Sequence, residues 1–242
     1  MLPRLFIDQR LSAAETLALP SGPARHVQVL RLQPGSALIL FDGNGGEWQA
    51  EVVTMGRSDV TVRLIAHHAV ERELPLQVTL ALGMPANERM DTLVEKATEL
   101  GVAAIQPLMC ERAVLRLAGE RADKKVAHWQ AVALAACEQS RRTRVPHIEP
   151  VRSLPQWLQG LPQAARDGRW ILSLHDAAPL AATAAPGEAL VCLSGPEGGL
   201  TPAEEAAALT AGFMPVSLGA RVLRADTAPL AALAWIAVQS AA

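Results

Sequence analysis

Tyrosine is absent from this sequence, and aromatic residues make up only 3% of its 242 positions. Half of the residues are hydrophobic, so the cores must be built mainly from Leu, Val, Ile and Ala. Neither sign of charge dominates, with 22 Lys and Arg against 24 Asp and Glu. A net charge of −2 provides no global attraction to a polyanion, so a nucleic-acid partner would require a local basic patch.

Cysteine is also scarce. The three cysteines, Cys110, Cys137 and Cys192, are scattered and form no Cys-x-x-Cys pair. This pattern predicts reduced thiols and no metal site. No apolar run is long enough to cross a bilayer, and the first residues lack the pattern of a signal peptide. We therefore expect a soluble cytoplasmic protein that has no membrane partner.

The common cofactor and hydrolase motifs are missing as well. The strand pattern at 77–82 is followed by Gly83-Met84-Pro85-Ala86 and not by Gly-x-Gly-x-x-Gly, and no Gly-x-x-x-x-Gly-Lys-Ser/Thr loop occurs. Gly-x-Ser-x-Gly and His-Glu-x-x-His are absent too. NAD, ATP, hydrolase and metalloenzyme functions therefore lack sequence support. The nearest candidate nucleophile, Ser194, is interpreted as a loop hydroxyl.

Residues 1–73 have the pattern of a small β-rich domain, a barrel or a curled sheet. Strands are expected at 37–41, 48–53 and 59–65, the first two joined by the turn residues 42–46. A short helix is expected at 25–32, and its His26 could contact phosphate or simply lie on the surface. The pattern changes after residue 73, where we place a domain boundary.

Residues 74–242 alternate between strand and helix patterns, which predicts an α/β fold. Strands are expected at 77–82, 102–109, 170–174, 189–193 and 214–218, and helices at 87–100 and 124–138. Thr201 and Glu204 predict a capping box that begins another helix. A last helix should be capped by Asp226 or Thr227, with Pro229 in its first turn.

Two glycine-bearing segments follow strands in this domain. They are Leu-Ser-Gly-Pro-Glu-Gly-Gly-Leu at 193–200 and Leu-Gly-Ala-Arg-Val-Leu-Arg-Ala-Asp-Thr at 218–227. One such segment could be a plain connection, but two at the carboxyl ends of strands favour a small-molecule site. The helix expected at 124–138 is followed by a basic cluster, Arg141, Arg142 and Arg144, which could bind phosphate or complement the helix dipole.

The two segments resemble the signature of the SPOUT methyltransferases. Further upstream, Val-Glu-Lys-Ala-Thr-Glu-Leu-Gly-Val at 94–102, Cys-Glu-Arg at 110–112 and Ala-Cys-Glu-Gln-Ser-x-Arg-x-Arg-Val-Pro at 136–146 resemble the RsmE branch, the 16S ribosomal RNA uridine N3-methyltransferases. The chain departs from this branch at 225–226, where Ala-Asp replaces Thr-Glu, and around 87–89, where a lysine is replaced. The resemblance implies a PUA-like β-barrel, a trefoil-knotted α/β domain, S-adenosylmethionine as cofactor, 16S rRNA of the small ribosomal subunit as substrate, and a homodimer.

The segments and the resemblance together assign three sets of site residues, and no metal. The catalytic candidates are Arg224 and then Arg221, which would stabilise the uracil anion; no general base is assigned. The cofactor set is Leu174, His175, Leu193, Ser194, Gly195, Gly198, Gly199, Leu218, Gly219, Leu223 and Thr227. The RNA set is Arg4, His26, Arg31, Arg112, Arg141, Arg142 and Arg144.

A competing hypothesis is a non-catalytic RNA-binding or ribosome-assembly factor that keeps the fold and has lost the chemistry. The intact glycines of both segments, together with Arg224, argue against it.

Overall fold

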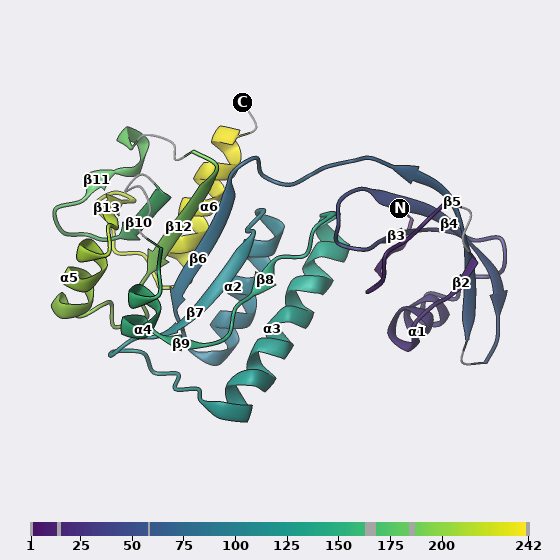
Figure 1. Cartoon of the computed structure of the whole chain (residues 1–242), viewed down its shortest axis with the longest axis horizontal. Coiled ribbons are helices and arrows are strands. Elements are labelled where there is room, and N and C mark those ends of the chain that lie inside the picture. Colours follow the sequence, from purple (N-terminus) through teal and green to yellow (C-terminus); the bar gives the residue numbers. More distant parts are fainter. Residues whose placement is uncertain (1, 14–15, 58, 163–167, 184–186, 241–242) are drawn as a thin grey trace. The chain divides into compact units, whose positions relative to one another are not determined.

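The computed structural model of the chain describes residues 2–13, 16–57, 59–162, 168–183 and 187–240 (Figure 1). The chain divides into two compact units. The first comprises Met1–Glu73 together with Cys137–Val145, and the second comprises Leu74–Ala136 and Pro146–Ala242. The end of one long helix, α3 (Gly119–Ser140), and the loop that follows it therefore belong to the N-terminal unit. No helix within the described ranges is long and apolar enough to span a bilayer.

The first unit contains a five-stranded sheet in the order β1-β3-β4-β5-β2. Its elements are β1 (Arg4–Phe6), β2 (Thr16–Ala18), α1 (Ser21–Val29), β3 (Ala37–Phe41), β4 (Glu47–Met55) and β5 (Val60–His68). The antiparallel pairing of β3 with β4 confirms the predicted hairpin, whose turn contains glycines at positive φ. On β5, Val60, Val62 and Leu64 are buried while Thr61 and Arg63 are not, as the alternation predicted. Helix α1 begins earlier in the chain than expected.

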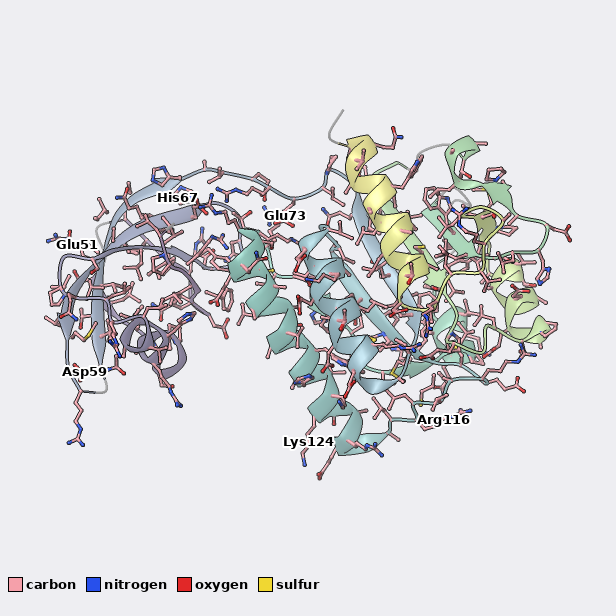
Figure 2. The ribbon with its side chains drawn as sticks, turned by 180° about the vertical axis from the view of Figure 1, so that it is seen from behind. Glu51, Asp59, His67, Glu73, Arg116 and Lys124 are labelled. Carbon is pink, nitrogen blue, oxygen red and sulfur yellow. The ribbon has the colours of Figure 1, made fainter. Side chains whose placement is uncertain are left out.

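Two acidic side chains hold the loop behind α3 against the rest of this unit. Glu73, labelled in Figure 2, pairs with Arg142, and its Oε1 accepts the amide of Thr143 at 3.1 Å. Glu71 accepts the hydroxyl of Thr143 at 2.6 Å and Nε of Arg144 at 3.2 Å. Two arginines of the predicted basic cluster, Arg142 and Arg144, are thus paired with Glu73 and Glu71.

The second unit is an α/β fold around an eight-stranded sheet. Its main path is β11-β13-β10-β12-β6-β7-β8, with β9 also paired to β7, and every pairing is parallel. The strands are β6 (Gln77–Gly83), β7 (Ala104–Met109), β8 (His147–Ile148), β9 (Arg152–Ser153), β10 (Arg169–Leu172), β11 (Ala178–Pro179), β12 (Ala189–Ser194) and β13 (Met214–Ser217). The five predicted strands are confirmed within a few residues, whereas the two-residue strands were not predicted.

Helices cover both faces of this sheet (Figure 1). They are α2 (Asn87–Glu99), α3 (Gly119–Ser140), α4 (Leu154–Gln159), α5 (Pro202–Thr210) and α6 (Thr227–Ser240), with a 3-10 turn at Leu180–Ala182. Val78 and Leu80 of β6 pack in a core cluster with residues of α2, α3 and α6, whereas Ala81 packs in another with residues of α4 and α5. Successive side chains of β6 therefore point to opposite faces of the sheet and pack in two different cores.

The two helix caps expected from the sequence have different outcomes. The capping box is confirmed: the amide of Glu204 donates to Thr201 Oγ1 at 3.2 Å, and the amide of Thr201 donates to Glu204 Oε2 at 2.9 Å. The other cap, expected from Asp226 or Thr227, is wrong: Thr227 is itself the first helical residue, and Asp226 Oδ1 has no hydrogen-bond partner among the described residues. Both early amides of α6, at Thr227 and Ala228, donate to the Arg224 carbonyl at 3.0 Å. The third helical residue is a proline without an amide hydrogen, so Asp226 has no donor left to cap.

Candidate functional site

A cavity of about 660 Å³ lies at the carboxyl ends of β10, β12 and β13 in the second unit. Parallel α/β sheets bind ligands at this edge because the loops that follow the strands converge there. Both glycine-bearing segments contribute to the wall: residues 194–200 begin at the last residue of β12, and residues 218–225 follow β13. The two segments that the sequence analysis singled out are therefore brought together.

The first segment is seated on the connection between β6 and α2. A Cβ added to Gly83 would lie 2.5 Å from Pro196 Cδ, so the segment crosses a position where no side chain fits. The carboxylate of Glu197 accepts the amide of Ala86 at 3.0 Å and pairs with Arg89 at 3.6 Å. Arg89 and Glu197 were not predicted as site residues, and both line the cavity.

On the other wall, two serine side chains accept backbone amides, as Glu197 does on the first. Ser173, after β10, accepts the amide of His175 at 3.1 Å, and Ser217, at the end of β13, accepts the amide of Gly219 at 3.2 Å. Ser173 also donates to Glu205 of α5 at 3.2 Å. A serine two residues before the residue it binds is a local turn signal that sequence reasoning overlooked.

Gly219 adopts a φ of +103°, and no atom lies within 4 Å of its absent Cβ. The position is therefore open to the cavity that it lines. Gly199 likewise combines positive φ with open space, whereas Gly195 is packed, since its Cβ would lie 3.0 Å from the Leu200 amide nitrogen. The glycines thus serve different purposes: two leave space and one permits a close backbone approach.

Charge around the cavity is mostly positive. Four arginines line it, Arg89, Arg112, Arg221 and Arg224, together with two glutamates, Glu197 and Glu205. The predicted catalytic residues Arg221 and Arg224 are both exposed, and neither forms an ion pair with any residue that the structure describes.

Nine of the eleven residues predicted to bind the cofactor line the cavity. They are Leu174, His175, Ser194, Gly195, Gly198, Gly199, Leu218, Gly219 and Leu223. The other two lie outside the lining: Leu193 is fully buried in the sheet, and Thr227 is the first residue of α6.

The residues predicted to bind RNA differ in their exposure. Arg4 is buried, where its Nε donates to Glu47 at 3.2 Å and its Nη1 to the carbonyl of Cys137 at 3.1 Å. Arg142 is also buried, against Glu73. These two side chains are corrected to structural positions because their charge faces an internal carboxylate. The remaining residues of the N-terminal unit in this set are exposed: His26, Arg31, Arg141 and Arg144.

Arg112 belongs to the second unit, where it lines the cavity. Its Nη1 donates to the carbonyl oxygens of Gly198 at 3.2 Å and Leu200 at 3.4 Å.

The three cysteines are free and buried. Burial raises the pKa of Cys110, Cys137 and Cys192 to about 12, so these thiols stay protonated and unreactive at neutral pH. Across the described ranges, no three His, Cys, Asp or Glu side chains gather where they could hold a metal ion.

Comparison with known proteins identifies the family. A profile of the RNA methyltransferase domain matches residues 72–237, and one of the RNA methyltransferase PUA domain matches residues 24–65. Ribosomal RNA small subunit methyltransferase E of Synechocystis is 33% identical over 98% of this chain and 77% of its own length. The protein of the same name from Mycobacterium bovis is 36% identical over 98% of this chain and 92% of its own.

Solved structures agree. The crystal structure of ribosomal RNA small subunit methyltransferase E from Neisseria gonorrhoeae, bound to S-adenosyl methionine, matches with a TM-score of 0.92 and 36% identity over 99% of this chain and 98% of that one. A Legionella pneumophila methyltransferase in complex with the same cofactor matches with a TM-score of 0.92 and 30% identity over the same shares. The resemblance inferred from the motifs is confirmed, and the chain belongs to the RNA methyltransferase family that includes ribosomal RNA small subunit methyltransferase E.

Proposed function

We propose that this protein transfers a methyl group from S-adenosylmethionine to N3 of a specific uridine in 16S rRNA of the small ribosomal subunit. The observation that carries the proposal is the meeting of both family segments in one cavity at the carboxyl edge of the sheet. Near full-length relatives have been crystallised with this cofactor in the same fold.

The residues around the cavity fit that cofactor. The volume of about 660 Å³ lies within the range of small-molecule sites. Leu172, Leu218 and Leu223 offer apolar wall for the adenine ring. Open space at Gly219 gives a ligand direct access to the backbone, and the carboxylate of Glu205 faces the same space as a counter-charge for a cationic ligand.

When bound, S-adenosylmethionine supplies a methyl group on a sulfonium, which is already a good leaving group. The protein therefore has to orient the uridine in line with that methyl group and stabilise charge on its ring. In this proposal Arg224 and Arg221 donate to the uracil carbonyl oxygens, which favours the ring that has lost its N3 proton. Their exposed side chains at the cavity wall support this role. We assign no general base, and the proton leaves to water or to a group outside this chain.

We further infer that the exposed basic residues of the N-terminal unit bind the RNA backbone. His26 and Arg31 lie at the end of α1, and Arg141 and Arg144 lie in the loop behind α3. Arg141 has a positive φ of 68° at a helix end. Its side chain faces solvent, where it can reach a phosphate.

The finer architecture is also a proposal. The family resemblance supports a PUA-like barrel in residues 1–73, a trefoil knot in the domain at 74–242 and a cytoplasmic homodimer. Helix α6 carries apolar residues on all sides, and Val238 is 71% exposed. A helix that is apolar all round is normally covered, and a second copy of this chain would cover it.

The test uses small ribosomal subunits and free 16S rRNA from a strain that lacks this gene. The purified protein should transfer labelled methyl groups to one of these substrates, and mass mapping should place the mark on N3 of one uridine. S-adenosylmethionine should also raise the thermal midpoint, whereas ATP and NAD should not. Cofactor stabilisation without methyl transfer to either substrate would favour the assembly-factor alternative, and no stabilisation would refute the cofactor assignment.

A further inference from the structure

We propose that Arg112, with the buried Glu204 beside it, is a positioning residue that fixes the shape of the cofactor segment at 195–201. This inference rests on the proposed function, because it concerns how the same cavity is held open. It also gives Arg112 a role different from the RNA contact that the sequence suggested.

The guanidinium of Arg112 is bound to the backbone of the cofactor segment. Its Nη1 donates to the carbonyl oxygens of Gly198 and Leu200, at 3.2 and 3.4 Å. One cation thus binds two carbonyls that are two residues apart in the segment. Bonds from a charged donor are stronger than those between neutral groups, so this contact can hold a glycine-rich stretch that has little intrinsic preference for one conformation.

The backbone at Gly198 also packs closely against Arg112. A Cβ added to Gly198 would lie 2.9 Å from the Cβ of Arg112 and 3.3 Å from its carbonyl oxygen. Any side chain at this position would push the segment away from residues 110–112. Gly198 is therefore required by its packing against Arg112, and not by a need for space in the cavity.

Glu204 also joins the cofactor segment to residues 110–112. It is only 8% exposed, and its two carboxylate oxygens accept backbone amides from both sides. Oε1 accepts the amide of Glu111 at 2.7 Å, and Oε2 accepts the amide of Thr201 at 2.9 Å. The capping glutamate of α5 thereby also binds the residue next to Arg112. A buried carboxylate with both oxygens bonded has little freedom to shift.

The stretch 110–112 is itself anchored. Arg116, labelled in Figure 2, donates to the carbonyl of Glu111 at 2.6 Å. The amide of Ala113 donates to the carbonyl of Cys110 at 3.2 Å, which closes a turn after β7. Arg112 therefore projects from a fixed base, and the cofactor segment takes its position from it.

The experiment compares Arg112→Ala, Arg112→Lys and Glu204→Gln with wild type. Arg121→Ala is the matched control, since Arg121 is an exposed arginine of α3 that does not line the cavity. Three quantities are measured: cofactor affinity by calorimetry, methyl transfer as separate kcat and KM values, and the salt dependence of RNA binding. Wild-type binding of the cofactor tests the proposed function first, independently of the variants.

We expect Arg112→Ala to weaken cofactor binding about ten- to a hundredfold, as the loss of bonds to a charged group does. KM for the cofactor should rise in step, kcat at saturation should stay near wild type, and the salt slope of RNA binding should not change. Glu204→Gln should shift the same quantities in the same direction, and the control should shift none.

An RNA contact would give the opposite pattern: intact cofactor affinity with a salt slope reduced by about one. That result would overturn the proposal, as would a fall in kcat with KM unchanged. If Arg112→Ala does not fold, Arg112→Lys decides. Lysine keeps the charge but loses the planar fork, so weakened cofactor binding supports positioning and wild-type affinity refutes it.

Discussion

Arg142 and Glu73 form a buried ion pair, with side chains that are only 5% and 8% exposed. Nε of Arg142 donates to Glu73 Oε2 at 2.8 Å, and Oε1 of the same carboxylate accepts the amides of Thr143 and Arg144 at 3.1 and 3.2 Å. One carboxylate therefore neutralises the arginine and satisfies two amides of the loop behind α3. The basic cluster read from the sequence contains a structural arginine beside its exposed ones.

Arg142→Ala should lower the free energy of unfolding by about 3–5 kcal/mol, because it leaves the buried carboxylate of Glu73 uncompensated. Arg144→Ala is the matched control: its pair with Glu71 joins side chains that are 51% and 47% exposed, and such surface pairs contribute about 0–1 kcal/mol. Urea denaturation followed by circular dichroism measures both. Equal losses in the two variants would show that burial of the pair has no special weight.

A second prediction concerns the stability of the fold at low pH. Glu47 accepts both terminal nitrogens of Arg72, at 3.0 and 3.1 Å, and Nε of Arg4 at 3.2 Å. Burial alone would raise the pKa of the Glu47 carboxyl, but the bonds and charge of Arg72, and then of Arg4, outweigh it and lower that pKa below its ordinary value. A carboxyl with a lowered pKa in the folded state stabilises the fold above its unfolded pKa, and this stabilisation is lost as pH falls through the folded value.

Wild type should therefore lose stability as the pH falls below about 4.3, the ordinary pKa of glutamate. Glu47→Gln should be less stable than wild type at pH 7, and the difference should shrink in acid. Denaturation at a series of pH values from 7 to 3 measures this. Glu51→Gln serves as the comparison, since the Glu51–Arg63 pair lies nearer the surface at 3.4 Å. A difference for Glu47→Gln that stayed constant across the series would contradict the assignment.

A third prediction tests whether Gly219 is needed for open space in the cavity or only for its left-handed backbone conformation. Gly219 and Gly212 have similar positive φ values, +103° and +89°, and neither has an atom within 4 Å of its absent Cβ. Only Gly219 lines the cavity. Valine at either position should cost about 1–2 kcal/mol or more of stability from the left-handed backbone. Gly219→Val should also abolish measurable cofactor binding in calorimetry, whereas Gly212→Val should leave it intact. Equal cofactor affinity in both would remove Gly219 from the site.

The features that were predicted well depend on neighbouring residues. The hairpin of β3 and β4, the capping box at Thr201 and Glu204, and the two glycine segments each carry their signal within a few positions. The failed cap at Asp226 has an equally local cause. Pro229 at the third helical position has no amide hydrogen for Asp226 to accept, and the sequence itself shows this proline. Helix α4 carried a signal as well, with proline in its first turn, and was overlooked.

Tertiary pairings were beyond reach because they join distant residues. Glu73 and Arg142 are 69 positions apart, and Arg112 and Gly198 are 86 apart. Charge alone could not tell which arginines face solvent and which face a buried carboxylate. The two-residue strands β8 and β9 are too short to show any periodicity, and only their pairing with β7 defines them.

The last prediction assigns Arg224 to the transition state. Its carbonyl accepts the first two amides of α6, so its backbone is fixed while its exposed side chain lines the cavity. A purely structural role would need a partner within the chain, such as the carboxylate of Asp226 or Glu197, or a backbone carbonyl of the kind that Arg112 binds. Among the described residues, no hydrogen bond or ion pair joins the Arg224 side chain to such a group, and Glu197 pairs with Arg89 instead.

In single-turnover methyl transfer at saturating cofactor and RNA, Arg224→Ala should be slower by about a hundred- to a thousandfold, the usual effect of removing one donor to a developing oxyanion. Arg224→Lys should also be impaired, because an ammonium cannot donate through a planar fork. Cofactor affinity should stay within a few-fold of wild type in both, which separates this residue from Arg112. The exposed Arg121→Ala variant should react at the wild-type rate. If Arg224→Ala reacted at a rate within a few-fold of wild type, Arg224 would have no part in the chemical step, and the uracil oxygens would have to be bound by Arg221 or by a group outside this chain.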